Sequence, residues 1–205
     1  MKYDDLDNAQ KERARNWLRE HTFTDNTDWS HVYDDVDRMA ELLGIDINRR
    51  YFKTMGGGSG SEPTIYFMGF SSQGDGACFE GTYRYKKGAV KAIAAETNDA
   101  ELLRIAKALQ AVQRRHFYKL TARCMHRGHY YHSGCMRVEV THADDSYRDI
   151  GDAEGEVAQL MRDFADWIYK RLWDEHDYQT SDEVIEQTIR LNDYDFDVGD
   201  DGIRI

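Results

Sequence analysis

Apolar residues recur at three- and four-residue steps in six segments of the chain, which is the periodicity of a helix with one buried face. In the second segment, Val32, Val36 and Met39 fall on one face, and Gly44 stands where a glycine commonly ends a helix. The predicted helices are Asp4–Glu20, Asp28–Leu43, a short helix from about Lys87 to Ala94, Asp99–His116 with Asn98 as its N-cap, Asp152–Glu175, and a helix from Ser181 to about Leu191.

Runs rich in β-branched and aromatic residues predict the strands. The alternation is clearest where Met136, Val138 and Val140 are separated by polar residues, as in a half-buried strand. The predicted strands are Ile45–Phe52, Thr64–Phe70, Cys78–Tyr85, and the pair Phe117–Met125 and Tyr130–His142, which form a hairpin around Arg127 and Gly128, with a small hairpin in residues 194–205. The Gly/Ser run Gly56–Ser61 predicts a flexible segment that Pro63 closes.

The order of these elements predicts the fold class. Because the helices are not interleaved singly between the strands, a parallel doubly wound sheet is disfavoured. The sequence predicts an α+β fold in which helices pack against an antiparallel sheet of about four to six strands. The 205 residues, 40% of them hydrophobic, are sufficient for one packed core. We therefore expect a single domain over residues 1–205, with an acidic helical part in 1–48, a sheet and basic helix in 49–142, and a second acidic helical part in 143–205.

The absence of long apolar runs bears on the compartment. No run approaches the roughly 18 apolar residues of a membrane span, and the N-terminal residues lack the apolar centre of a signal peptide. We expect a cytoplasmic protein with no membrane partner.

Charge is distributed unevenly along the chain. The net charge is −11, yet residues 84–138 hold 12 Lys/Arg against 3 Asp/Glu, and residues 139–205 hold 6 against 20. One interpretation is that the acidic ends fold over the basic middle. The other is that carboxylates are displayed to a basic, nucleic-acid-binding surface of a partner protein, because clustered charge selects partners. The residues expected to make that display are Asp163, Asp166, Asp174, Glu175, Asp182, Glu183 and Glu186.

The loop before the third predicted strand suggests a cysteine hydrolase as an alternative function. Such an enzyme needs a thiolate, a base and an oxyanion donor, and Cys78, His129 and Gln73 are of the required types. His126 and His132 are further candidates for the base. The opposing interpretation is that Cys78 is a small core residue after a tight connection, in which Gly74 and Gly76 adopt positive φ and Asp75 caps the turn.

Five potential zinc ligands occur in the predicted hairpin: Cys124, His126, His129, His132 and Cys135. Zinc accepts both residue types, but the paired short spacings of structural zinc sites are missing. A polar sheet surface that faces a partner explains the same residues. We expect no cofactor, with zinc as the alternative.

A basic segment with interleaved aromatic residues is the third candidate site. Backbone neutralisation together with base stacking requires this mixture, and residues 104–127 contain it. The net charge disfavours direct nucleic-acid binding by the whole chain, and cations at a helix C-terminus are favoured in any case. The candidate nucleic-acid residues are Arg114, Arg115, Lys119, Arg123 and Arg127.

Three segments carry a resemblance to a known family. They are Ile65–Gly81 with the following Tyr83–Ala89, then His126–His132, and Asp163–Tyr169. Together they resemble a family of small acidic phage and prophage proteins, some of which are labelled antitoxins of a toxin–antitoxin stability system. The resemblance implies a phage or mobile-element product, in the cytoplasm of an infected or lysogenic bacterium, that binds and blocks a host protein. It transfers no catalytic or metal-binding residue to this chain.

The leading hypothesis combines the charge map with this resemblance. It is a non-enzymatic protein that inhibits a bacterial defence complex or a toxin, in the manner of an anti-CRISPR protein or an antitoxin, by imitating nucleic acid with its carboxylates. The alternatives are the hydrolase that uses Cys78 and the nucleic-acid-binding module of residues 104–127. The oligomeric state, a homodimer included, stays open.

Overall fold

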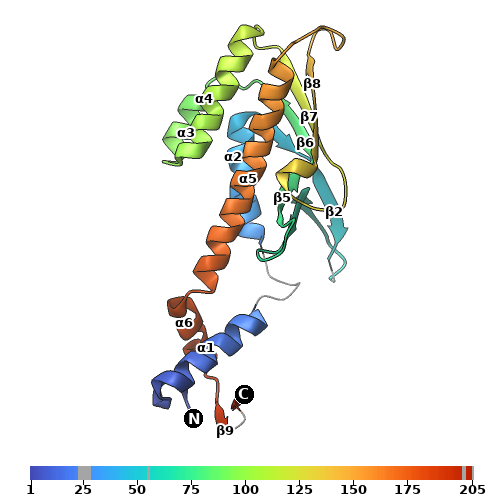
Figure 1. Cartoon of the computed structure of the whole chain (residues 1–205). Helices are drawn as coiled ribbons and strands as arrows, with labels where there is room; N and C mark the ends of the chain where they lie inside the picture. Colours follow the sequence, from blue (N-terminus) through green and yellow to red (C-terminus); the bar gives the residue numbers. More distant parts are fainter. Residues whose placement is uncertain (23–28, 55, 200–201, 205) are drawn as a thin grey trace. The chain divides into compact units, whose positions relative to one another are not determined.

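The computed structural model describes residues 1–22, 29–54, 56–199 and 202–204, and it has an α+β fold (Figure 1). The chain forms two compact units. The larger unit is Ser30–Leu172, and the smaller unit combines Met1–Trp29 with Trp173–Ile205. Whether the two units unfold together as the expected single domain stays a prediction, and each unit is described by itself below.

A four-stranded antiparallel sheet is the framework of the larger unit. Its strand order is β1 (Ile45–Ile47), β6 (Gly81–Arg84), β7 (Leu120–His126) and β8 (Met136–His142). Alternate residues of β8 are buried, beginning with Met136, as the sequence pattern predicts. This sheet confirms the predicted fold class.

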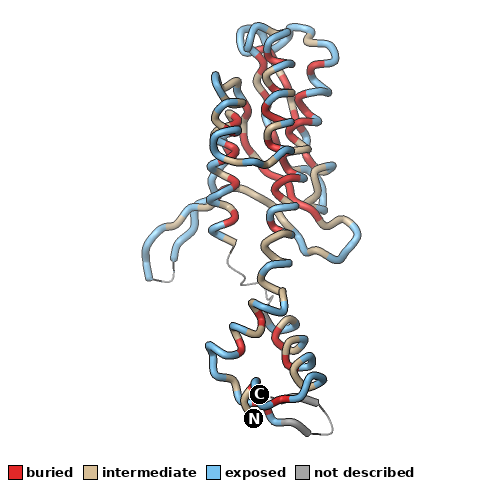
Figure 2. Tube along the Cα trace, turned by 90° about the vertical axis from the view of Figure 1, so that its left-hand side faces the viewer, coloured by how far each residue is buried: buried red, intermediate tan, exposed pale blue. Residues whose placement is uncertain are grey.

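Helices cover one face of this sheet (Figure 1). They are α2 (Ser30–Leu43), α3 (Ala89–Glu96), α4 (Ala100–Arg115) and the first part of α5 (Ala153–Gln179). The buried positions lie on these helices and on the sheet, whereas the hairpin of β2 (Arg49–Lys53) and β3 (Ser59–Pro63) is mostly exposed (Figure 2). A second hairpin pairs β4 (Ile65–Met68) with β5 (Gly76–Phe79).

Two predicted strands are each divided in the structure. Ile45–Phe52 separates into β1 and β2 at Asn48, and Cys78–Tyr85 separates into β5 and β6 at Glu80. The backbone N–H of Asn48 donates to the Glu80 carbonyl at 2.8 Å, so two hairpins meet at this point. The sequence predicts that the whole Gly/Ser run Gly56–Ser61 is flexible, but its last three residues, Ser59–Ser61, are paired with β2 in the structure.

The predicted hairpin of β7 and β8 has a longer connection than the sequence indicates. Phe117 and Tyr118 have φ angles of 54° and 60°, so β7 begins only at Leu120. Residues 127–135 form a loop that ends in the 3₁₀ turn η2 (Ser133–Cys135), where the sequence predicts strand from Tyr130.

Caps define the helix ends of the larger unit. Gly44 follows α2 with φ +86°, as predicted. The N-cap of α4 is Asp99 and not Asn98, because the Asp99 carboxylate accepts hydrogen bonds from the backbone N–H groups of Glu101 and Leu102. The predicted start of the second helix at Asp28 lies outside the described residues, and α2 itself begins at Ser30.

The smaller unit has a core of its own. It contains η1 (Tyr3–Asp5), α1 (Asn8–Thr22), the end of α5 from Trp173, α6 (Asp182–Leu191), β9 (Asp197–Gly199) and β10 (Gly202–Arg204). The predicted helix from Asp4 thus begins later, at Asn8, whereas the terminal hairpin is confirmed by the antiparallel pairing of β9 and β10. The buried core residues are Tyr3, Leu6, Ala14, Leu18, Ile185, Ile189 and Phe196.

No helix in the described parts of the chain combines the length and apolar character that crossing a membrane requires.

Candidate functional site

Aromatic rings from separate segments of the larger unit meet beside the β4–β5 hairpin. Tyr66 on β4 lies 4.8 Å from the ring of His126, at the end of β7, and 5.5 Å from the ring of Tyr131 (centroid distances). Burial, followed by the nearby charge of Glu80, raises the pKa of Tyr66. Segments that are 60 residues apart in the sequence therefore form one ring cluster.

A second ring cluster lies against helix α5. Because Tyr66 and Phe67 are consecutive residues of β4, their side chains point to opposite faces of the hairpin. Phe70 lies 4.9 Å from Phe67 and 5.8 Å from Tyr169 of α5. The Tyr169 hydroxyl donates a hydrogen bond to the Gly69 carbonyl at 3.3 Å. Burial, with a smaller effect from the charge of Asp75, raises the pKa of Tyr169. All three segments that carry the family resemblance thus contribute rings to one or the other face of the β4–β5 hairpin.

Two glycines permit the loop 127–135 to lie against the hairpin. A Cβ atom on Gly74 would stand 2.7 Å from the Tyr130 ring, and one on Gly76 would stand 2.6 Å from Cβ of His132. Gly74 has the predicted positive φ, at +99°, but Gly76 does not, so Gly76 is needed for close approach and not for its dihedral angle.

The Asp75 carboxylate holds the connection between β4 and β5. It accepts hydrogen bonds from the backbone N–H groups of Ser71 and Ser72, at 2.7 and 2.6 Å, which confirms its predicted capping role.

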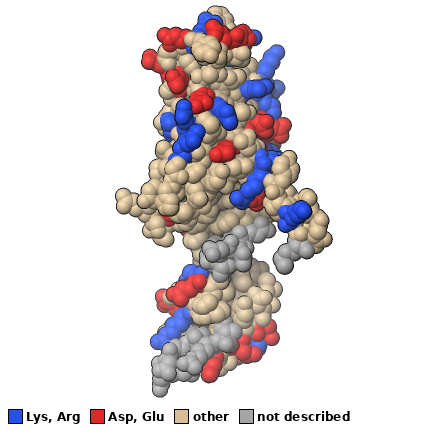
Figure 3. All heavy atoms as spheres, turned by 90° about the vertical axis from the view of Figure 1, so that its right-hand side faces the viewer, with Lys and Arg blue, Asp and Glu red and all other residues tan. Residues whose placement is uncertain are grey.

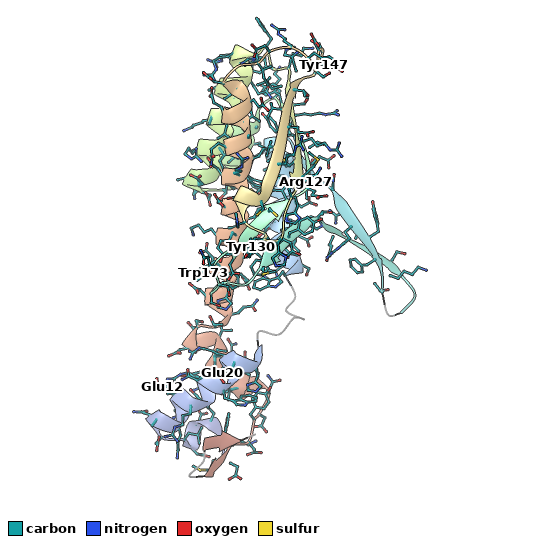
Figure 4. All side chains as sticks on the ribbon, turned by 45° about the vertical axis from the view of Figure 1, so that its right-hand side comes forward. Glu12, Glu20, Arg127, Tyr130, Tyr147 and Trp173 are labelled. Atoms are coloured by element: carbon teal, nitrogen blue, oxygen red, sulfur yellow. The ribbon has the colours of Figure 1, made fainter. Side chains whose placement is uncertain are left out.

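We call the two ring clusters that flank this hairpin, together with the rings of the adjoining loop 127–135, the aromatic–histidine surface. Met68 and Tyr130 are its most exposed large apolar members, with 42% and 49% of their surface accessible. Arg127 and Tyr130 are labelled in Figure 4 on the loop that carries them. The surface comprises Tyr66, Phe67, Met68, Phe70, His126, His129, Tyr130, Tyr131, His132 and Tyr169. Sequence reasoning identified its histidines and two tyrosines, but it missed Tyr66, Phe67, Phe70 and Tyr169, whose only signal was their place within the family-like segments.

The structure disfavours Cys78 as a nucleophile. Cys78 is fully buried in β5, and burial raises its pKa to about 12, whereas Gln73 is exposed in the loop. A hairpin histidine does meet a thiol, but the pair is His132 and Cys135, with Nε2 3.4 Å from Sγ.

The tautomer of His132 decides what this pair can do. Its Nδ1 accepts a hydrogen bond from the backbone N–H of Gly134 at 3.1 Å, so the neutral ring carries its proton on Nε2. Nε2 therefore donates to the sulfur of Cys135 and is not positioned to remove its proton. His129, the other candidate base, is exposed.

The five candidate zinc ligands do not gather in one place. Cys124 is buried in the sheet, and burial raises its pKa to about 12. The His126 ring lies against Tyr66, and its Nε2 is 3.0 Å from the Tyr130 carbonyl oxygen. Among the residues that the structure describes, no group of three or more His, Cys, Asp or Glu side chains is arranged to hold a metal ion.

Several residues of the expected acidic display are engaged by arginines of the same chain. In the larger unit, Asp163 pairs with Arg104 of α4 and also accepts a hydrogen bond from Gln159. Asp166 and Glu183 are exposed, whereas Asp174 and Glu175 are half-buried.

In the smaller unit, arginines of α1 bind the carboxylates of α6. Asp182 pairs with Arg19, and Glu186 pairs with Arg15 at 2.9 Å. Burial opposes ionisation of Glu186, but hydrogen bonds from Tyr3 and Arg15 outweigh it and lower the pKa of this carboxyl group. These carboxylates join helices to each other.

The candidate basic residues are likewise paired or dispersed. Arg115 binds Glu156 at 2.5 Å, and Lys119 binds Asp144 at 3.3 Å. Arg114 lies beside Arg115 in the last turn of α4, where cations are favoured by the helix dipole.

On the sheet, Arg123 stands opposite Glu139 in the β7–β8 register, and Arg127 is exposed in the loop. Figure 3 shows basic and acidic groups interspersed over this face and no continuous basic area. These pairs favour internal compensation over a charged display of either sign.

Fold and site together define an α+β protein whose β4–β5 hairpin is flanked by aromatic rings and histidines. Residues 29–182 match the family described as "Domain of unknown function (DUF8835)", and the chain belongs to this family. No curated protein and no solved structure matches the chain. The matched range contains the whole aromatic–histidine surface and ends at the first residue of α6.

Proposed function

We propose that the protein is a non-enzymatic binding protein, encoded by a phage or mobile element, that inhibits a bacterial defence complex or a toxin in the host cytoplasm. It contacts its target through the aromatic–histidine surface. The observation that carries this proposal is that three family-like segments, distant in sequence, bring their rings to the two faces of the β4–β5 hairpin, with Met68 and Tyr130 exposed there.

The chemistry of the surface supports a protein target. Large, rigid aromatic side chains and methionine are enriched at the centres of protein interfaces and dominate their energetics. Met68 and Tyr130 leave nearly half of their surface exposed, and the other members of the surface are half-buried except for the exposed His129. The contact of Tyr130 with Gly74 and the hydrogen bond from Tyr169 hold the rings before any partner arrives, which reduces the ordering cost of association.

Imitation of nucleic acid receives less support than a direct aromatic contact. Asp163, Asp182 and Glu186 already bind arginines within the chain, and a mimic requires carboxylates that are free to meet a partner. The proposed contact therefore does not depend on the acidic residues.

The test compares a surface variant with a matched control. Met68→Ser combined with Tyr130→Ala removes the exposed members of the surface, while Tyr147→Ala removes a tyrosine that is 98% exposed in a different loop of the same unit. We expect the first variant to lose capture of a specific host protein, and to lose protection of a phage or neutralisation of a toxin. The Tyr147 variant should retain all of these.

Both variants must keep the circular-dichroism spectrum of the wild type. Loss of activity in both to the same extent, or in neither, would refute the assignment of this surface. If the surface variant retained inhibition but reversal of the exposed Asp166 and Glu183 abolished it, the acidic display would be the contact instead.

A further inference from the structure

The face of the sheet that the helices leave uncovered carries a row of polar side chains. In the register, Arg84 of β6 lies opposite Thr121 of β7, and Thr121 lies opposite Thr141 of β8. Their neighbours along the strands, such as Tyr83 and Val140, are buried, whereas these three are exposed or half-buried. The three side chains therefore form one row across the uncovered face, which is the face seen in Figure 3.

Two adjoining depressions share this row. One, of about 530 Å³, extends from Arg84, Thr121 and Thr141 to the turn formed by residues 142–146. The other, of about 240 Å³, extends from the same three residues toward Arg123 and Thr82. Together they make a continuous polar groove along the end of the sheet.

The groove offers hydrogen-bond donors and a cation without a carboxylate partner. Arg104, Arg115 and Arg137 of the same unit pair with carboxylates, but no carboxylate among the described residues pairs with Arg84. The hydroxyl oxygens of Thr121 and Thr141 are 3.1 Å apart. When Thr121 donates to Thr141, the Thr141 hydroxyl keeps its own proton for a ligand; in the opposite arrangement the Thr121 hydroxyl donates to the Thr141 carbonyl, 3.4 Å away.

The carboxylates that line the groove are occupied elsewhere. Asp144 binds Lys119 at 3.3 Å, which brings a second cation to this end of the sheet. Asp145 accepts a hydrogen bond from the backbone N–H of Tyr147 at 3.0 Å, so it is turned into its own loop. Glu139, which lines the smaller depression, pairs with Arg137 at 2.8 Å. None of the three carboxylates therefore neutralises Arg84.

His142 also lines the larger depression, but its ring belongs to the other face of the sheet. Met136, Val138, Val140 and His142 are the buried positions of β8, and successive residues of a strand point to opposite faces. The polar groups of the groove are therefore Arg84 and the hydroxyl side chains, without the His142 ring.

We propose that this groove is a binding site for a small anionic ligand whose phosphate or carboxylate group pairs with Arg84. The hydroxyls of Thr141 and Ser146 donate hydrogen bonds to the remaining oxygens of the anion, while Thr121 donates to Thr141. The set of guanidinium and hydroxyl donors suits an oxyanion, because charge-assisted hydrogen bonds to anionic oxygens are the strongest available to these side chains. The site is separate from the aromatic–histidine surface and does not depend on its function.

The test follows amide signals of the full chain by NMR while inorganic phosphate, or acetate in a parallel series, is added at constant ionic strength. We expect saturable shifts at residues 84, 121 and 141–146. Arg84→Gln should weaken binding about tenfold or more, and Thr141→Val should weaken it while leaving the charge unchanged. The two series distinguish a phosphate site from a carboxylate site.

Arg50→Gln is the matched control, because Arg50 lies on β2, pairs with Glu62 and does not line either depression. It should change the affinity by less than about twofold. Shifts that do not saturate, or equal weakening by Arg84→Gln and Arg50→Gln, would mean general attraction of anions and would overturn the proposal. A well-dispersed spectrum of each variant shows that it is folded.

Discussion

Replacing Gly74 by alanine tests whether the hairpin and the loop 127–135 are coupled as the structure indicates. Gly74 has φ +99°, which an L-residue adopts only with strain of about 1–3 kcal/mol. The new methyl group would also stand 2.7 Å from the Tyr130 ring, and overpacking of this kind costs about 1–3 kcal/mol more. We therefore expect Gly74→Ala to lower the free energy of unfolding by about 2–6 kcal/mol, measured by urea denaturation.

The chain offers a control that separates the two contributions. Gly88 has a similar φ of +85°, but no atom lies within 4 Å of the Cβ position, so Gly88→Ala introduces backbone strain without a clash. It should cost about 1–2 kcal/mol. In a Tyr130→Ala background, Gly74→Ala should lose its excess cost relative to Gly88→Ala. Equal costs at the two glycines, with a coupling energy to Tyr130 below about 0.5 kcal/mol, would refute the contact.

Three further predictions concern stability and thiol chemistry. Gln113→Leu removes a buried amide that donates to the Leu120 carbonyl at 2.8 Å and accepts from its N–H at 3.1 Å, so we expect a loss of about 2–5 kcal/mol in urea denaturation. Glu186 has a folded pKa below its ordinary value. Its contribution to stability is therefore complete above the unfolded pKa and declines as pH falls through the folded pKa. Glu186→Gln should reduce this dependence of the unfolding free energy on pH over that acidic range, as measured by denaturation at a series of pH values. Because burial raises the pKa of Cys78 to about 12, iodoacetamide should label the half-buried Cys135 first in the native protein, as read by peptide mass spectrometry, and early labelling of Cys78 would contradict its burial.

Local sequence patterns were sufficient to predict those elements whose structure depends on a single segment of the chain. The alternation from Met136 to Val140 predicts β8, and the glycine after Leu43 predicts the end of α2. The divisions at Asn48 and Glu80 were not predictable, because the hydrogen bond between these residues joins segments that are distant in sequence. A strand pattern indicates that a segment favours a strand and which of its side chains face the core. It does not indicate the point at which the segment leaves one sheet and joins another.

The same limit applies to the charges. The sequence shows 20 acidic residues after Val138, but it does not show which of them arginines will engage. Arg15 on α1 binds Glu186 on α6 across 171 positions, and no periodicity within either helix indicates this pair. A display of carboxylates and a set of interhelical ion pairs therefore look alike in a sequence, and only the positions of the arginines distinguish them.

The family-like segment Asp163–Tyr169 illustrates how this distinction changes a functional interpretation. Its first residue, Asp163, binds Arg104 and so joins α5 to α4 within the fold. Its last residue, Tyr169, packs against Phe70 and donates to the Gly69 carbonyl at the aromatic–histidine surface. One segment thus contains a carboxylate with a structural role and a ring that belongs to the proposed contact surface. The segment therefore supports the proposal of an aromatic contact, and it gives no support to a display of charge.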